Sequence, residues 1–188
     1  MDIEAGNKQG QIEQPESEKK WEIWKTIEIG GKNTQVLEAE LKQKGIYFHK
    51  YALKMIRSHD FVTLKQSEQI NLVRLKVSDL GFSLLPPTRD QIYQKARDLG
   101  LDLCPAEVGP ELRLKHDGSP SGERLYVGMK HIDLPDEDYF SQPEPYVFVL
   151  ERDKYNSKKD GIALIGLFAL TTHHMQLGDE FVFRLRNA

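Results

Sequence analysis

The sequence predicts an α+β fold in which three helices, mostly in the N-terminal half, pack on a largely antiparallel sheet formed mainly by the C-terminal half. Helical periodicity with capping residues is concentrated before residue 100, whereas apolar runs separated by Gly, Pro, Asp and Ser dominate after it. A chain of 188 residues with 39% apolar residues can bury one sizeable core. We therefore expect a single α+β domain over residues 21–188.

The first 20 residues are predicted to form a disordered tail. They are rich in Gln, Glu, Lys, Gly and Pro and bury too little apolar surface to offset the entropy of ordering the chain. The start of the chain lacks the pattern of a secretory signal, and no apolar run approaches the roughly 18 residues that span a bilayer. We expect a cytoplasmic protein that has no membrane partner.

A strand and a helix are predicted at the start of the domain. Residues Trp21–Ile29 alternate apolar and polar side chains and precede two glycines, a pattern typical of a half-buried strand. Thr34 is predicted as the N-cap of the first helix, and Gly45 follows its end.

Two further helices enclose a second strand. Residues 70–82 switch to period two through Val73, Leu75 and Val77, and the chain is predicted to leave the strand at Asp79. Thr88 and Gln91 form a capping box that begins the third helix, and Gly100 ends it. The stripe that predicts the second helix consists of Phe48, Ala52, Met55 and Ile56.

The C-terminal half is predicted to be rich in strands. Between two of them, the acidic, proline-bearing segment Asp133–Pro145 is too long for a tight turn and is predicted to be a mobile loop. The predicted strands are Glu111–Lys115, Arg124–Ile132, Tyr146–Arg152, Ile162–Leu170 and Glu180–Arg186.

The middle of the chain resembles a group of uncharacterised bacterial proteins. The matching residues are Val77–Phe82, Thr88–Leu99, Cys104-Pro105, Val108–Pro110 and Leu112–Leu114. The resemblance implies a shared fold and a bacterial origin, and it implies no activity.

A polar group after the third helix suggests one catalytic alternative. Histidine, arginine and glutamate side chains perform acid–base and phosphate chemistry in metal-independent nucleases. Glu111, Arg113, His116 and His131 are the candidate catalytic residues for such a nuclease or toxin-like enzyme. The competing interpretation is a half-solvated sheet face with cross-strand ion pairs.

A basic segment over residues 42–65 suggests a second alternative, nucleic-acid binding. It interleaves cations with aromatic side chains on two short predicted helices, and such a face can contact phosphates. Lys50, Lys54 and Arg57 are the candidate contact residues. The competing interpretation is the solvated side of helices that pack through Phe48 and Met55.

No metal or cofactor is expected. His173 and His174 lie near Asp179, but the chain has no spaced set of metal ligands, and a solvated loop pair is the simpler interpretation. Cys104 is the one cysteine and follows a helix end, where the helix dipole disfavours a thiolate, so we expect it to be buried and structural.

The function that best fits these observations is a non-catalytic binding or regulatory module. The sequence contains no phosphate-binding loop and no nucleophile elbow. Its net charge of −3 argues against wholesale binding to a phosphate backbone, although a local basic patch remains open. The expected partner is a protein or a nucleic acid, contacted through the basic helical half or an exposed sheet face.

Overall fold

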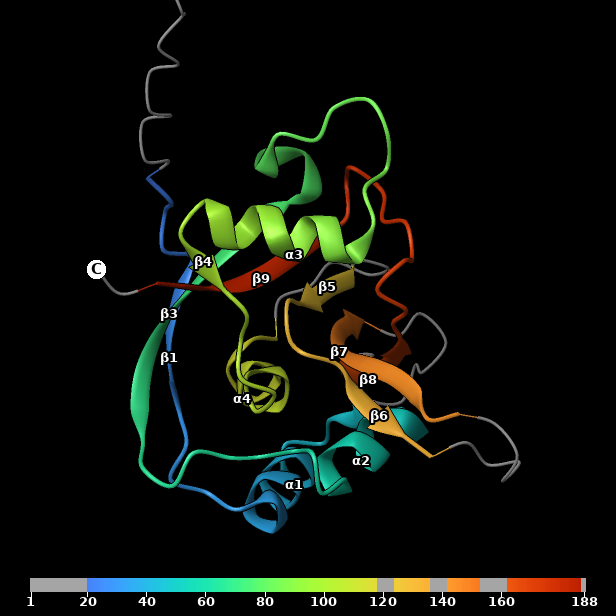
Figure 1. Cartoon of the computed structure of the whole chain (residues 1–188). Helices are drawn as coiled ribbons and strands as arrows, with labels where there is room; N and C mark the ends of the chain where they lie inside the picture. The colour runs from blue at the N-terminus through green and yellow to red at the C-terminus, as the bar shows by residue number, and fades with distance from the viewer. Residues whose placement is uncertain (1–19, 118–123, 136–141, 153–161, 187–188) are drawn as a thin grey trace, which may run out of the picture.

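A mixed β-sheet runs through the part of the chain that the computed structural model describes, residues 20–117, 124–135, 142–152 and 162–186 (Figure 1). The elements are β1 (Lys25–Ile29), α1 (Thr34–Gln43), β2 (Tyr47–Phe48), α2 (Lys50–Arg57), β3 (Glu68–Lys76), a 3-10 helix η1 (Val77–Leu80), α3 (Arg89–Asp98), β4 (Leu101–Asp102), α4 (Val108–Lys115), β5 (Arg124–Val127), β6 (Ile132–Leu134), β7 (Glu144–Arg152), β8 (Ile162–Phe168) and β9 (Glu180–Leu185).

The sheet has the strand order β1-β3-β9-β5-β7-β8-β2. The pairs β9–β5 and β8–β2 are parallel, and the other pairs along this order are antiparallel. Outside this order, β4 pairs with β9 and β6 pairs with β7, both antiparallel. The prediction of an α+β fold with a largely antiparallel sheet is therefore confirmed.

The buried apolar residues form two clusters, one on each face of the sheet. Successive residues of a strand point to opposite faces, and Leu72 of β3 belongs to one cluster while Val73 belongs to the other. Helices α1, α2 and α4 pack in the first cluster, and α3 and η1 pack in the second (Figure 1). The chain length predicts one sizeable core. In the structure the sheet separates the buried apolar residues into two layers, one on each of its faces.

The prediction of a strand over Glu111–Lys115 is wrong, because these residues belong to α4. Every residue from Val108 to Arg113 is buried, so the helix has no continuous polar face along those residues. Pro110 lies in the first turn, where its missing N–H is tolerated. Helical signals are present, since Val108 and Leu112, and also Glu111 and Lys115, are spaced by four residues.

Four α-helices are found in the described residues instead of three, and several predicted boundaries move. The N-cap of α1 is Asn33 instead of Thr34; its side chain accepts a hydrogen bond from Val36 N at 2.9 Å. The first strand begins at Lys25 instead of Trp21, and the strand before Asp79 ends at Lys76. The predicted capping box of α3 is confirmed.

The predicted strand Arg124–Ile132 is two strands, β5 and β6, separated after Val127. A Cβ atom at Gly128 would lie 2.3 Å from Cε1 of Phe183, so the close packing there requires glycine. Gly128 N still donates to Val182 O at 2.9 Å, which keeps the chain against β9 before it turns away.

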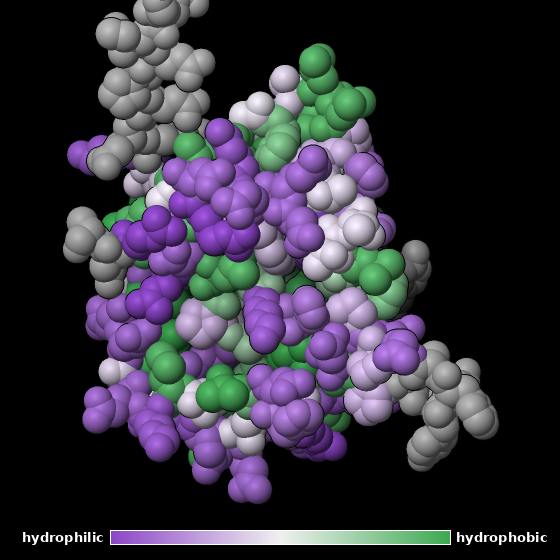
Figure 2. All heavy atoms as spheres, viewed as in Figure 1, coloured by the Kyte–Doolittle hydropathy of each residue, from purple (hydrophilic) through white to green (hydrophobic). Residues whose placement is uncertain are grey.

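The segment Asp133–Pro145, predicted as a mobile loop, is partly strand. Asp133 pairs with Pro145 and Leu134 pairs with Glu144 where β6 meets β7. Residues 136–141, and residues 1–19 of the predicted tail, lie outside the described residues. Figure 2 shows a face dominated by hydrophilic side chains over α3, with a hydrophobic group above it at the loop between η1 and α3.

Candidate functional site: a basic groove along α2

A groove of about 610 Å³ lies between α2 and the end of β6. Its volume falls within the roughly 300–1,000 Å³ of typical ligand pockets. Both aliphatic side chains and cations line it. The lining residues are Lys50, Leu53, Lys54, Arg57, Ser58, His59, Leu134 and Pro135.

Helical spacing places the basic residues of α2 on the groove. Lys50, Leu53, Lys54 and Arg57 occupy positions i, i+3, i+4 and i+7, which share one face of a helix. The buried residues of α2 are on the opposite side and pack in the first core cluster; they are Ala52, Met55 and Ile56.

The sheet beneath α2 is shaped to receive the helix. A Cβ atom at Gly166 of β8 would lie 2.7 Å from Ala52 N, so glycine permits the backbone of α2 to approach the strand. Tyr51 stacks on Tyr146 of β7 with a centroid distance of 4.5 Å. These contacts fix the orientation of α2 and therefore of its basic face.

Ring and carboxylate contacts hold the cations of α2 in position. The ammonium groups of Lys50 and Lys54 lie 4.8 and 5.6 Å from the Tyr51 ring centroid. Arg57 donates to both carboxylate oxygens of Glu38, at 2.9 and 2.6 Å. These bonds from Arg57, with a further one from Lys42, hold the pKa of Glu38 at about 2. The groove therefore combines an aliphatic lining with an ordered cationic rim.

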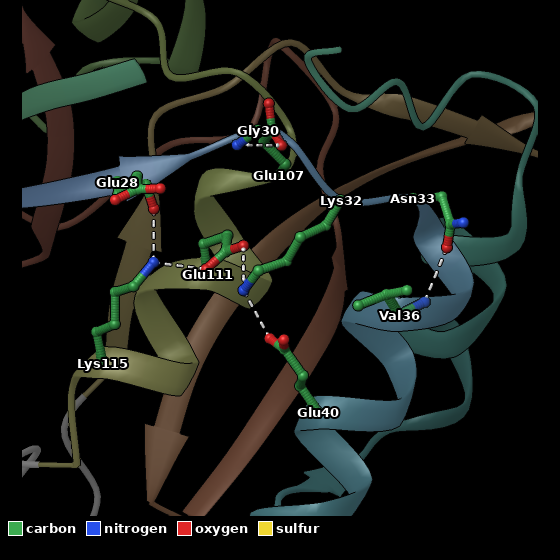
Figure 3. Close-up of polar contacts among 9 residues, drawn as sticks. All are labelled: Glu28, Gly30, Lys32, Asn33, Val36, Glu40, Glu107, Glu111 and Lys115. Atoms are coloured by element: carbon green, nitrogen blue, oxygen red, sulfur yellow. Dashed lines mark hydrogen bonds and ion pairs between the residues drawn. The ribbon is translucent and has the colours of Figure 1, made fainter. Parts of the chain in front are cut away.

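A second polar cluster joins α4 to β1 and α1 (Figure 3). The buried carboxylate of Glu107 accepts hydrogen bonds from Gly30 N and Leu64 N, both at 3.0 Å. Glu111 contacts Lys32 at 3.2 Å and Lys115 at 2.6 Å. Through these contacts, both glutamates connect α4 to neighbouring segments of the fold.

At the C-terminal end of α4, basic side chains bind the last backbone carbonyl groups, and no glycine caps the helix. Lys44 donates to Leu114 O at 2.5 Å, and Lys25 donates to Lys115 O at 3.2 Å. Arg113 donates to His116 O, while its Nε and Nη1 have no hydrogen-bond partner among the described residues. The carbonyl groups that a helix leaves unpaired at its C-terminus attract positive charge, which favours this arrangement.

The four predicted catalytic residues do not converge on one accessible place. Glu111 and Arg113 are each 1% exposed, and a separation of two residues on a helix turns their side chains about 200° apart. Burial, with the charges of Arg113, Lys25 and Arg74, lowers the pKa of His116 to about 4. Nε2 of His131 lies 3.7 Å from Oδ1 of Asp133. Among the described residues, His131 forms no hydrogen bond or ion pair with Glu111, Arg113 or His116.

Cys104 is buried, as predicted, with 4% exposure. Burial raises the pKa of its thiol to about 12, so the thiol stays protonated at neutral pH. His173 and His174 are exposed in a loop, where Nδ1 of His174 lies 2.8 Å from Pro86 O. Within the ranges that the structure describes, no three His, Cys, Asp or Glu side chains are grouped to hold a metal ion.

Comparisons of the chain with family models, curated proteins and solved structures found no match. In the described part of the chain, the helices are too short and too polar to cross a bilayer.

Proposed function

We propose that this chain is a non-catalytic binding module that holds an apolar segment flanked by acidic residues in the groove along α2. The observation that carries the proposal is that the groove combines aliphatic side chains with the cations of α2. The aliphatic side chains are those of Leu53, Leu134 and Pro135. Apolar contacts supply most of the binding free energy of such a segment, while opposite charges at the rim fix its orientation and exclude other partners.

The lining of the groove favours a peptide over a nucleic acid. Proteins that bind single strands stack bases on aromatic side chains, whereas the groove is lined by aliphatic and polar residues, with His59 as its one aromatic ring among the described residues. Tyr51, the aromatic residue of α2, is stacked on Tyr146 instead.

Reversing charge on the rim tests this proposal. We expect the double variant Lys50→Glu/Lys54→Glu to bind a labelled peptide with a leucine pair between aspartates at least about tenfold more weakly than the parent protein. Fluorescence anisotropy measures the affinity. Lys50 begins α2, where a carboxylate is favoured by the helix dipole, so we expect the fold to be retained.

The matched control is Lys65→Glu/Lys95→Glu, which changes the net charge equally outside the groove. Its affinity should stay within about twofold of the parent. Equal binding by the groove variant and the parent would contradict the proposal. Tighter binding of a polyuridine RNA than of the peptide, with an affinity that falls steeply with salt, would instead support the nucleic-acid alternative.

A further inference from the structure

The loop between η1 and α3 carries two solvent-exposed leucines. Leu84 and Leu85 are 89% and 79% exposed, more than any other large apolar residue in the described ranges. Figure 2 shows hydrophobic side chains projecting at this loop. Two adjacent leucines in water mark a contact surface, because their burial against a partner is strongly favourable.

The stem of this loop is fixed by the surrounding backbone. Gly81 ends η1 in the left-handed conformation with φ of 98°. On the other side, Nδ1 of His174 lies 2.8 Å from Pro86 O, and Met175 N donates to Pro87 O at 2.9 Å. The leucines are therefore held outward before any partner arrives, which lowers the entropic cost of binding.

Two exposed aspartates flank the two leucines in the sequence, and one of them, Asp79, also accepts a hydrogen bond from Lys76 N at 2.7 Å. Asp79 and Asp90 are exposed on either side of the loop. From residue 77 to residue 94, between Lys76 and Lys95, Arg89 is the one lysine or arginine, and it is 2% exposed. An anionic lipid surface would repel these acids, whereas a cationic rim around an apolar groove would attract them.

We infer that the segment bound by the α2 groove is the Leu84–Leu85 loop of a second copy of this chain. The inference rests on the proposed function, since it names the occupant of that groove. The leucines match the aliphatic residues Leu53 and Leu134, and Asp79 and Asp90 match the cations of α2. The loop and α2 lie at opposite ends of the molecule in Figure 1, so the contact forms between copies.

This contact joins two different surfaces, so the association is head-to-tail. Each copy offers one loop and one groove, and an unclosed head-to-tail contact generates a growing chain of copies instead of a closed dimer. A contact made by two leucines and two aspartates belongs among weak and reversible interfaces.

Sedimentation equilibrium over about 10 μM to about 1 mM protein tests the inference. We expect the mean mass of the parent protein to rise with concentration beyond that of two copies. The loop variant Leu84→Ser/Leu85→Ser and the groove variant Lys50→Glu/Lys54→Glu should each lose at least about tenfold in association constant. Ile23→Ser, which also removes an exposed apolar side chain, should associate like the parent.

Mixing the two variants gives the sharpest result. The loop of the groove variant is intact, as is the groove of the loop variant, so the mixture should form a dimer and stop there. A parent protein that stays monomeric throughout the range, or a loop variant that associates like the parent, would overturn the inference. Co-sedimentation of the parent, but not of the loop variant, with phosphatidylserine vesicles would overturn it in favour of a membrane contact.

Binding of the aspartate-flanked peptide separates this inference from the proposed function. The loop variant keeps its groove and should bind that peptide like the parent. If the parent binds the peptide but stays monomeric, the inference fails and the proposed function stands. If the parent neither binds the peptide nor associates, both fail.

Discussion

Replacing Glu107 by alanine is expected to lower the free energy of unfolding by about 2–5 kcal/mol. The Glu107 side chain is 1% exposed, and its two oxygens accept hydrogen bonds from Gly30 N and Leu64 N. Alanine would leave both donors unpaired; Gly30 N is buried, where an unsatisfied donor costs about 1–3 kcal/mol, and Leu64 N is half-buried. The bonds join the end of β1 and the segment before β3 to the start of α4.

Urea denaturation measures this loss. Glu107→Gln is the matched control, because it keeps the side-chain length and one acceptor oxygen, and we expect its loss to be intermediate. Glu40→Ala, which removes a half-buried carboxylate that pairs with Lys32 in the same polar cluster, should cost under about 1 kcal/mol. A Glu107→Ala protein as stable as the parent would show that these two bonds do not hold the elements together.

The protein is expected to lose about 2–3 kcal/mol of stability as the pH falls from about 6.5 to about 4, because of His116. Burial is the largest cause that lowers the pKa of His116, from 6.5 to about 4, and Arg113 is the next. In this window the unfolded chain binds a proton that the folded chain rejects, so acid favours unfolding. The ring also lies against Trp24, at a centroid distance of 5.0 Å.

Unfolding at a series of pH values tests this prediction, with His116→Gln as the comparison. The variant should show a flatter profile between pH 6.5 and 4. The ion pair of Glu38 is a separate contribution, because the pKa of that carboxyl is about 2 and its stabilisation is lost from about pH 4.5 downward. Parallel profiles for the parent and His116→Gln would contradict the assignment.

Local signals identify α3 as a helix, whereas those of α4 fit a strand equally well. The N-terminus of α3 is closed by its own side chains, since Thr88 and Gln91 bond to each other's backbone N–H groups. Residues Val108–Arg113 are buried all round, so the contrast between polar and apolar faces that identifies a helix is absent there. The alternation of Glu111–Lys115 then matches a strand as well as a helix.

The basic half of the groove was predictable, and its apolar half was not. Lys50, Lys54 and Arg57 share a helix face by spacing alone. Leu53 lies on that same face. An apolar residue on the basic face of a helix indicates that this side chain does not pack in the core. Leu134 and Pro135 reach α2 only through the pairing of β6 with β7, which depends on contacts distant in sequence.

The most direct test of the account is an NMR titration of the isotopically labelled protein with the aspartate-flanked leucine peptide. The backbone amides of Lys50–His59 and Leu134 should shift progressively and saturate, while those of β1 stay in place. Shifts confined to α3 or to the end of α4, or a spectrum unchanged at high peptide concentration, would contradict the assignment of the α2 groove as the binding site.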